Sequence, residues 1–257
     1  ELPEVVSILL SIFTILVIIN AFNLIDGING LSGSIGTLIT LIIGTWFLLI
    51  DHVELAIIAF ALAGALIAFL KYNYTPAKIF MGDTGAMLVG VICAILAIQF
   101  IELQPTSSRY APYAFRAAPI VAIGILILPL FDTLRVFITR AMKGRSPFYP
   151  DRTHIHHLLI DFGFSHMQAT GILVVVNILF IVMTYSLDGI GSLNLLMVIL
   201  GLASFLSAGL YYTVSRNKQR LKTTQPMNAY LLAFIGGGLG SLCRFGLPSL
   251  FHHFPWV

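Results

Sequence analysis

Charged side chains are scarce in this sequence. Asp, Glu, Lys and Arg make up 10% of the 257 residues, whereas 58% of the residues are hydrophobic; an average soluble domain has about 25% charged residues. This shortage of charge excludes a disordered chain, a basic nucleic-acid-binding domain and almost any soluble globular enzyme, and it leaves a polytopic membrane protein. The formal net charge of +3 is too small to indicate a polyanionic partner.

Cysteines and targeting signals are also sparse. The two cysteines, Cys93 and Cys243, both lie in apolar runs, so we expect them to pack as small hydrophobic side chains rather than to form a disulfide or a metal site. The first residues have neither a basic region nor a small-residue cleavage site and are not typical of a signal peptide.

Long apolar runs, by contrast, fill most of the chain. A membrane-spanning helix needs about 20 mostly apolar residues, with a range of about 17–25. Seven runs meet this requirement: residues 5–22, 31–50, 55–70, 84–101, 117–138, 167–187 and 189–212. The third run is short and reaches the required length only when it is extended to include Val53 and Tyr72. A Gly-rich stretch, 230–250, is an eighth candidate. Strands do not explain runs of this length, so we predict an all-α fold, a polytopic integral membrane helical bundle.

Basic residues are distributed unevenly between the two sets of loops. Loops 23–30, 71–83, 139–166 and 215–228 together hold ten Lys and Arg residues, whereas the N-terminus and the loops near 51–54, 102–116 and 188 hold two. Because cytoplasmic loops carry the excess of Lys and Arg, we predict that the first set faces the cytoplasm.

The first of four polar clusters follows the run 5–22 and contains Asn20, Asn23, Asp26 and Asn29, with glycines that permit a sharp break. Asn23 and Asp26 are three positions apart, so a helical turn would place both on one face. A polar helix end followed by a turn is the simpler interpretation. It needs only one or two such residues, so we favour a functional role.

The second cluster is Phe80-Met-Gly-Asp83-Thr-Gly, directly before the run 84–101. Asp83 can cap that helix, or it can ligate a hard cation such as Mg²⁺; the motif alone favours neither. In the third cluster Asp132 and Arg135 are one helical turn apart, so a structural ion pair is a slightly better interpretation than a direct ligand role.

The fourth cluster contains Arg152, His154, His156 and His157. Zinc is one candidate ligand for the histidines, but no Cys or carboxylate accompanies them at a familiar zinc spacing. Imidazole and guanidinium groups also donate hydrogen bonds to phosphate, and anion binding beside a Mg²⁺ site is the better interpretation.

Together these clusters supply metal ligands and phosphate-binding groups on one membrane face, which indicates phosphoryl transfer. The sequence contains no Walker motif, kinase signature or nucleophile elbow, so these side chains themselves must hold the phosphates. A transporter or channel with the clusters as gates is the alternative. The one-sided placement and the lack of an internal repeat favour an enzyme.

In this order the clusters resemble the polyprenyl-phosphate N-acetylhexosamine-1-phosphate transferases, a family that includes bacterial undecaprenyl-phosphate GlcNAc-1-phosphate transferases and the phospho-MurNAc-pentapeptide translocases. The resemblance covers about residues 1–222, and the His-Ile-His-His form is more similar to the GlcNAc-type branch. The motifs that carry it are Asn20-Ala-Phe-Asn23-Leu-Ile-Asp26-Gly27, Phe80-Met-Gly-Asp83-Thr-Gly85, Asp132-Thr133 and Pro150-Asp151-Arg152-Thr153-His154-Ile155-His156-His157.

The resemblance implies that a polyprenyl-phosphate oxygen attacks the β-phosphorus of a UDP-N-acetylhexosamine, with GlcNAc the expected sugar, and that UMP leaves. This step would initiate a cell-envelope glycan, such as lipopolysaccharide or teichoic acid, at the cytoplasmic face of the bacterial inner membrane. The resemblance is also compatible with a homodimer of two copies of the chain.

By the same resemblance Asp83 would be the central Mg²⁺ ligand, or Mn²⁺ ligand, with Asn23 as the second. Asp26 and Asn29 would shape the nucleotide end. Arg152 and the three histidines would hold the diphosphate, and apolar grooves between helices suit the prenyl chain. The expected catalytic residues are Asp26, Asp83, His154, His156 and His157, and the expected substrate-binding residues are Asn23, Asn29, Asp132, Arg152, His154, His156 and His157.

Two departures accompany the resemblance. The family carries an Asp-Asp pair on an upstream cytoplasmic loop, and this sequence contains no Asp-Asp dipeptide and starts with Glu1. We therefore expect that the N-terminal spans are absent and that this chain alone shows little or no turnover. Gly237, Gly240, Arg244 and Phe245 resemble the first helix of a fluoride-channel-type protein, with a Gly-rich packing helix as the alternative. We accordingly divide the chain into a transferase domain, 1–222, and an appended hydrophobic segment, 223–257, which we suspect comes from a fused reading frame.

Overall fold

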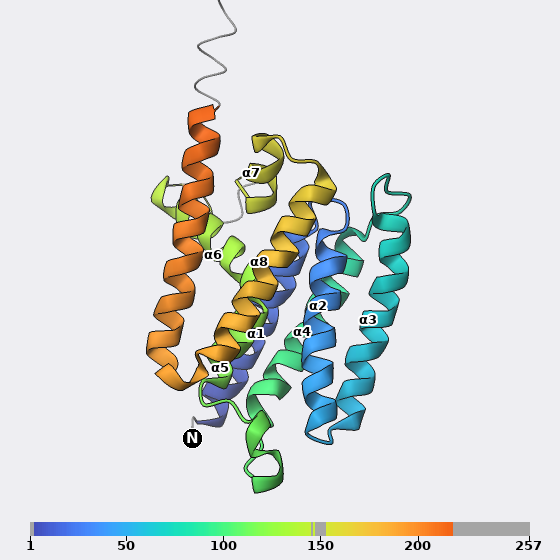
Figure 1. The fold of residues 1–257 in the computed structure, drawn as a ribbon, viewed down its shortest axis with the longest axis vertical. Helices are drawn as coiled ribbons and strands as arrows, with labels where there is room; N and C mark the ends of the chain where they lie inside the picture. Colours follow the sequence, from blue (N-terminus) through green and yellow to red (C-terminus); the bar gives the residue numbers. More distant parts are fainter. Residues whose placement is uncertain (1–2, 145, 147–152, 218–257) are drawn as a thin grey trace, which may run out of the picture. The chain divides into compact units, whose positions relative to one another are not determined.

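The computed structural model describes residues 3–144, 146 and 153–217, and within these ranges it contains helices and no strands (Figure 1). The chain forms two compact units, Glu1–Leu210 and Tyr211–Val257; of the second, only residues 211–217 are described. The elements in order are α1 (Glu4–Ile25), α2 (Leu31–Leu49), α3 (Val53–Asn73), α4 (Gly82–Glu102), η1 (Ser108–Tyr113), α5 (Ala118–Ile125), α6 (Ile127–Met142), α7 (Ile155–Phe162), α8 (His166–Ser186), η2 (Asp188–Ile190) and a last helix, Ser192–Asn217.

Six of these helices are long and apolar enough to cross a membrane: α1, α2, α3, α4, α8 and Ser192–Asn217. They match six of the seven predicted runs, so the polytopic all-α prediction is confirmed. Consecutive spans run in opposite directions, which brings the α1–α2, α3–α4 and α6–α8 connections to one end of the bundle (Figure 1). The candidate run 230–250 and the whole segment 223–257 lie outside the described residues.

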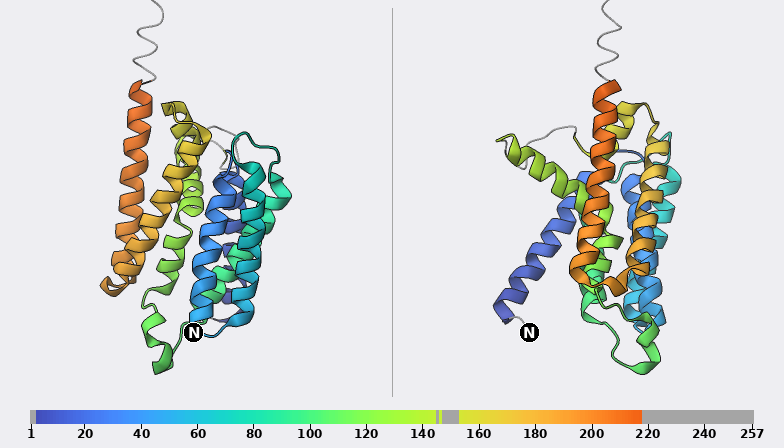
Figure 2. Two further views of the ribbon diagram at one scale, coloured as in Figure 1. Left: turned by 45° about the vertical axis from the view of Figure 1, so that its right-hand side comes forward. Right: turned by 60° about the vertical axis from the view of Figure 1, so that its left-hand side comes forward.

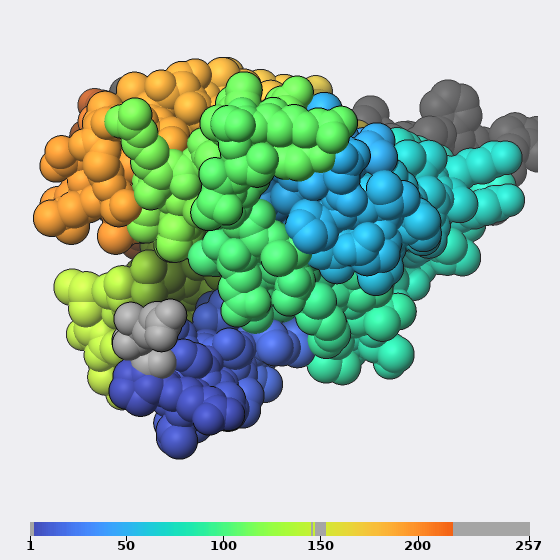
Figure 3. Space-filling view, turned by 90° about the horizontal axis from the view of Figure 1, so that it is seen from below, coloured from blue at the N-terminus to red at the C-terminus, as the bar shows by residue number. Residues whose placement is uncertain are grey.

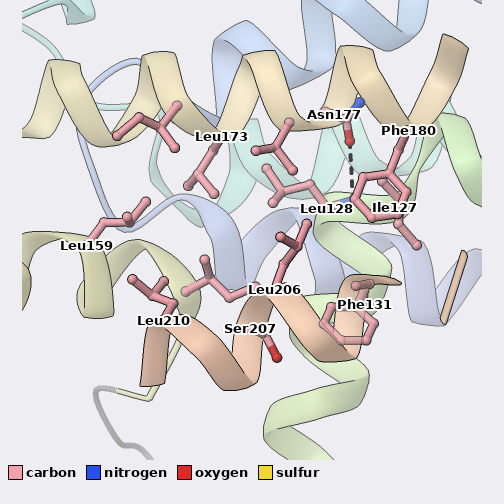
Figure 4. Close-up of a pocket in the computed structure, with 14 residues that line it drawn as sticks. Ile127, Leu128, Phe131, Leu159, Leu173, Asn177, Phe180, Leu206, Ser207 and Leu210 are labelled. Carbon is pink, nitrogen blue, oxygen red and sulfur yellow. Dashed lines mark hydrogen bonds between the residues drawn. The ribbon is translucent and has the colours of Figure 1, made fainter. Parts of the chain in front are cut away.

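The predicted span over 117–138 is not one straight helix, because α5 and α6 meet at a bend of 67°; the bent pair makes a seventh span if it is counted as one. Pro129 has no N–H to donate to the Ile125 carbonyl one turn earlier, so the helical ladder breaks there. Asn177 of α8 forms hydrogen bonds with backbone groups on both sides of the break. Its Nδ2 donates to Ile125 O at 3.1 Å. Its Oδ1 accepts from Leu128 N at 3.3 Å (Figure 4). A broken helix is tolerated at membrane depth when a neighbouring helix satisfies the freed backbone groups, as Asn177 does here.

The crossing of α1 and α4 positions the polar ends of both helices. A Cβ atom at Gly90 would lie 2.8 Å from the Ile19 Cα atom, so only glycine lets the two backbones approach this closely. Asn23 lies one turn beyond Ile19, and Asp83 lies two turns before Gly90 in an antiparallel helix. The close crossing therefore brings Asn23 and Asp83 to the same place.

The opposite end of the bundle is closed by the 103–117 segment, which includes η1 and is green in Figure 3. Asp188 fixes this segment by accepting from the backbone N–H groups of Arg116 and Ala117, each at 2.8 Å, and Trp46 Nε1 donates to Tyr113 O at 2.8 Å. The two basic residues of this end, Arg109 and Arg116, both belong to this ordered segment.

Helix α1 buries only its C-terminal third. Its buried residues are Ile18, Ala21, Phe22 and Ile25, whereas the side chains of its N-terminal half are largely exposed. The right-hand view of Figure 2 shows this half diverging from α2, α3 and α4. The well-packed part of α1 is thus the part that carries the first polar cluster.

Candidate active site

The first two polar clusters meet at the end of the bundle where α1 ends and α4 begins. Asn23 Nδ2 donates to Asp83 Oδ1 at 3.2 Å, although the two residues are 60 positions apart. Asp26 follows the last residue of α1, and burial, together with the nearby negative charge of Asp83, raises its pKa to about 6. The structure therefore brings together two carboxylates and one amide, as the sequence predicts.

This group fits a magnesium ion. Mg²⁺ is commonly held by one or two carboxylates, and water and phosphate oxygens complete its coordination. Asp83 is exposed, so a substrate phosphate can reach it. Within residues 3–144, 146 and 153–217, no group of three His, Cys, Asp or Glu side chains is arranged to hold a metal ion.

Asn29 braces the loop after α1 rather than facing Asp83. Its side-chain Nδ2 donates to Thr75 Oγ1 at 3.1 Å, and its backbone carbonyl accepts from Thr170 Oγ1 at 2.9 Å. Asn73, which the sequence analysis missed, is buried and ties the same loop to the α3–α4 connection: Oδ1 accepts from Gly30 N at 2.7 Å, and Nδ2 donates to Ile79 O at 2.8 Å. A lone Asn at a helix end is usually a cap, so the sequence offers no signal for this role.

Asp132 anchors the fourth cluster. It is buried on α6, and it forms the predicted ion pair with Arg135 at 3.0 Å. It also accepts from the backbone N–H of Ile155 and pairs with His154 Nδ1, each at 3.0 Å, while Arg135 donates to the Thr153 carbonyl. Since the carboxylate binds the Nδ1 side of the imidazole, His154 turns its Nε2 atom away from Asp132.

His156 joins the fourth cluster to the first. Its side chain is 1% exposed and packs directly on Gly27, where an added Cβ atom would lie 2.3 Å from Nε2. Burial, and next the proximity of His157, lowers the pKa of His156 to about 3. Its Nε2 has no hydrogen-bond partner among the described residues. His156 is therefore a neutral, buried imidazole that packs against the loop that carries Asp26.

His157 is partly exposed, with its ring centroid 4.2 Å from that of His156, while the rings of His154 and His156 are stacked at 5.7 Å. The three histidines form one group, in which His156 contacts Gly27, and they differ in accessibility. Arg152 lies outside the described residues.

Two apolar spaces adjoin this end of the bundle. A groove of about 630 Å³ lies between α1, α6 and the last helix, and Asn20 and Thr133 line it among apolar side chains such as Phe13 and Leu134. A second cavity, of about 220 Å³, lies beneath α7 and is lined by Leu128, Leu159, Leu173 and Asn177, among others (Figure 4). The larger groove reaches Asn20, one turn before Asn23, and so ends close to the polar site.

Comparison with known proteins finds a match over the first part of the chain. Residues 1–101, from α1 to the end of α4, match the model of Glycosyl transferase family 4. This part of the chain is therefore similar to glycosyl transferase family 4. The family 4 segment contains Asn23, Asp26, Asn29 and Asp83, whereas Asp132 and the histidines come from the region that follows it.

Two curated relatives each match a little under half of the chain. The chain is 37% identical over 117 residues to the decaprenyl-phosphate N-acetylglucosaminephosphotransferase of Mycolicibacterium smegmatis, covering 44% of this chain and 29% of the relative. It is 36% identical over 120 residues to the undecaprenyl-phosphate alpha-N-acetylglucosaminyl 1-phosphate transferase of Escherichia coli K12, covering 45% of this chain and 30% of the relative. The match thus spans less than a third of the length of either relative.

Proposed function

We propose that this chain provides the sugar-nucleotide site of an enzyme that transfers GlcNAc-1-phosphate from UDP-GlcNAc to a polyprenyl phosphate. A lipid phosphate oxygen attacks the β-phosphorus of UDP-GlcNAc, the bond from that phosphorus to the bridging oxygen breaks, and UMP leaves. The convergence of Asn23, Asp26 and Asp83 beside the His154–His157 group is the observation that carries this proposal. The names of the relatives supply the sugar and the class of lipid.

Each side chain has a distinct role in this proposal. Asp83 and Asn23 would hold Mg²⁺, which would supply positive charge to neutralise the diphosphate, and Asp26 lies near Asp83 at the same end of α1. His154, oriented by Asp132, and the accessible His157 donate hydrogen bonds to phosphate oxygens. His156 acts differently: its ring holds the Gly27 loop and the histidine segment at a fixed separation.

The lipid substrate fits the groove between α1, α6 and the last helix. Its lining is almost entirely apolar, and burial of a prenyl chain contributes about 0.8 kcal/mol for each CH₂ group. Among the residues up to 210, Lys71, Lys78, Arg140 and Lys143 lie in or beside the loops at the site end, and Arg109 and Arg116 lie at the other end. This bias supports an active site on the cytoplasmic face of a bacterial inner membrane.

Binding of UDP-GlcNAc in the presence and absence of Mg²⁺ tests the proposal, with the 257-residue chain in detergent studied by calorimetry. We expect Mg²⁺-dependent binding that Asp83→Asn weakens by about tenfold or more, because a charge-assisted interaction contributes roughly 1.5–3 kcal/mol. Glu102→Gln is the matched control, since Glu102 is an exposed carboxylate at the opposite end of α4. Binding that needs no metal, or that both variants weaken equally, contradicts the proposal.

Release of UMP with added polyprenyl phosphate then distinguishes transfer from binding alone. A transporter or channel releases no UMP under any condition. The transferase proposal predicts release that requires Mg²⁺ and that Asp83→Asn abolishes, at a low rate if turnover needs the Asp-Asp pair that the family resemblance implies.

A further inference from the structure

A groove separate from the candidate active site runs along the membrane-facing side of α2, α3 and α8. It has a volume of about 670 Å³, and none of its lining residues belongs to the groove between α1 and α6. Its lining consists of Ser34, Thr37, Leu38, Leu41, Ile67, Leu70, Lys71, Tyr74, Met167, Thr170, Gly171, Val174 and Val175. All three helices are spans, so the groove faces the lipid phase along its length.

The polar and apolar residues of this groove are separated along the membrane normal. Ser34, Lys71, Tyr74 and Thr170 lie within one or two turns of the ends of α2, α3 and α8 at the site end of the bundle. Leu41, Ile67 and Val175 lie deeper in the same helices and are 40%, 53% and 55% exposed. The groove therefore has a polar mouth at the membrane surface and an apolar floor within the bilayer.

The charge of the mouth is positive. Lys71 is the one charged side chain among the groove's lining residues, and it lies in the last turn of α3 with Nζ 5.9 Å from the Tyr72 ring centroid. The hydroxyls of Ser34 and Tyr74, which line the same end of the groove, stand 3.4 Å apart. A cation and two hydroxyls that line one groove end at the level of the lipid headgroups match the phosphate of an anionic lipid.

We propose that this groove binds an anionic phospholipid. The phosphate contacts Lys71, Ser34 and Tyr74, and one acyl chain lies along Leu38, Leu41, Ile67 and Val175. The groove has a cation and hydroxyl groups at the membrane surface and apolar side chains below them. This order complements a phospholipid, which has a phosphate in its headgroup and apolar acyl chains below it. A second copy of the chain would have to present an acidic group at the mouth and an apolar face below it.

The bound lipid would stabilise the loop of the first polar cluster. The Tyr74 ring lies against Gly30, where an added Cβ atom would be 2.8 Å from it, and Thr170 donates to the Asn29 carbonyl. Both residues line the groove and both hold the 26–30 loop. A lipid that orders Tyr74 and Thr170 thus also orders the loop that carries Asp26 and Asn29. The lipid site itself does not depend on the proposed transferase activity.

Native mass spectrometry of the detergent-purified 257-residue chain tests this inference with phosphatidylglycerol and phosphatidylcholine as probes. We expect phosphatidylglycerol to bind more tightly, and Lys71→Gln to weaken its binding by about fivefold, the effect of one basic side chain near an anionic lipid headgroup. Lys78→Gln is the matched control, because Lys78 is an exposed lysine in the adjacent loop that does not line the groove.

A second variant, Gly171→Phe, fills the groove without disturbing its walls, because a Cβ atom at Gly171 meets nothing within 4 Å. We expect it to remove phosphatidylglycerol binding while the melting temperature in lipid-free detergent is unchanged. Equal binding of the two lipids, or unchanged binding in Lys71→Gln and Gly171→Phe, overturns the inference. Conversion of a dimer to a monomer by Gly171→Phe also overturns it, since a second copy would then occupy the groove.

Discussion

At the scale of single residues, Asp132 shows how one buried carboxylate organises a segment far along the chain. It binds Arg135 on its own helix, and it also binds His154 and the backbone of Ile155 at the start of α7. The candidate site histidines are thus positioned by α6, and in the proposed function Asp132 acts through them.

Replacing Asp132 by Asn tests this positioning role. The amide cannot accept from His154, Arg135 and Ile155 as a carboxylate does, and it leaves the Arg135 charge without its partner. We expect a loss of roughly 3 kcal/mol in the free energy of unfolding, as for other broken buried ion pairs. Thermal unfolding in detergent measures this, and a melting temperature equal to that of the unaltered chain would contradict it.

His156 makes the stability of the fold depend on pH. Its pKa is about 3 in the folded chain and about 6.5 when exposed in the unfolded chain. Between these values the unfolded chain binds the extra proton, so the contribution of His156 to stability is fully present above about pH 6.5 and decreases as the pH falls toward 3. His156→Gln cannot take up this proton.

We therefore predict that the drop in melting temperature between pH 7 and pH 5 is smaller for His156→Gln than for the unaltered chain. Comparison of the two drops cancels the titration of other groups. Equal drops would show that His156 is already accessible to protons in the folded state.

At the scale of helices, two positions determine how neighbouring helices pack: Asn177 and Gly90. Asn177 satisfies two backbone groups freed by Pro129, at the bend between α5 and α6. Asn177→Leu leaves a buried carbonyl and a buried N–H without partners, and each costs about 1–3 kcal/mol. Asn194→Leu is the control, because Asn194 is exposed and its side chain donates only to the nearby carbonyl of Ile190, four positions earlier in the chain. We expect thermal unfolding at markedly lower temperature for the first variant alone; equal melting of both would refute the bracing role.

Gly90 allows α1 and α4 to touch. Gly90→Ala forces the backbones apart and should separate Asn23 from Asp83, so both thermal stability and Mg²⁺-dependent UDP-GlcNAc binding should fall. Gly64→Ala, in an equally apolar helix with open space around the site of the new methyl group, should be neutral or slightly stabilising. A Gly90→Ala chain that retains full binding would show that the crossing does not set the site geometry.

Much of this architecture follows from sequence, and the exceptions have physical causes. The six straight spans were predictable because unbroken apolar runs of this length have few other stable conformations in a membrane. The ion pair of Asp132 with Arg135 was indicated by spacing, whereas the pairing of Asn23 with Asp83 was expected from the family resemblance alone. The bend at Leu126 was missed although Pro129 signals it, because the run remains apolar across the break. Three features depend on contacts between distant segments, which no local pattern shows. They are the hydrogen bonds of Asn73, the packing of His156 on Gly27 and the groove that Lys71 lines.

At the scale of the whole molecule, the antiparallel course of the spans brings four polar segments to one end of the bundle, while an ordered loop closes the other end (Figures 1 and 3). The family 4 match covers the half of the site that lies on α1 and α4, and the histidine half is supplied by α6 and α7. The division at residue 222 and the role of 223–257 remain predictions.

Photolabelling with a photoreactive UDP-GlcNAc analogue, followed by peptide mapping, tests the central claim most directly. If the site is as described, labels will lie in segments 23–30, 75–85 and 153–157, will require Mg²⁺, and will disappear with excess unlabelled UDP-GlcNAc. Labels confined to the 103–117 end, or labelling that competition and metal removal leave unchanged, would contradict the account.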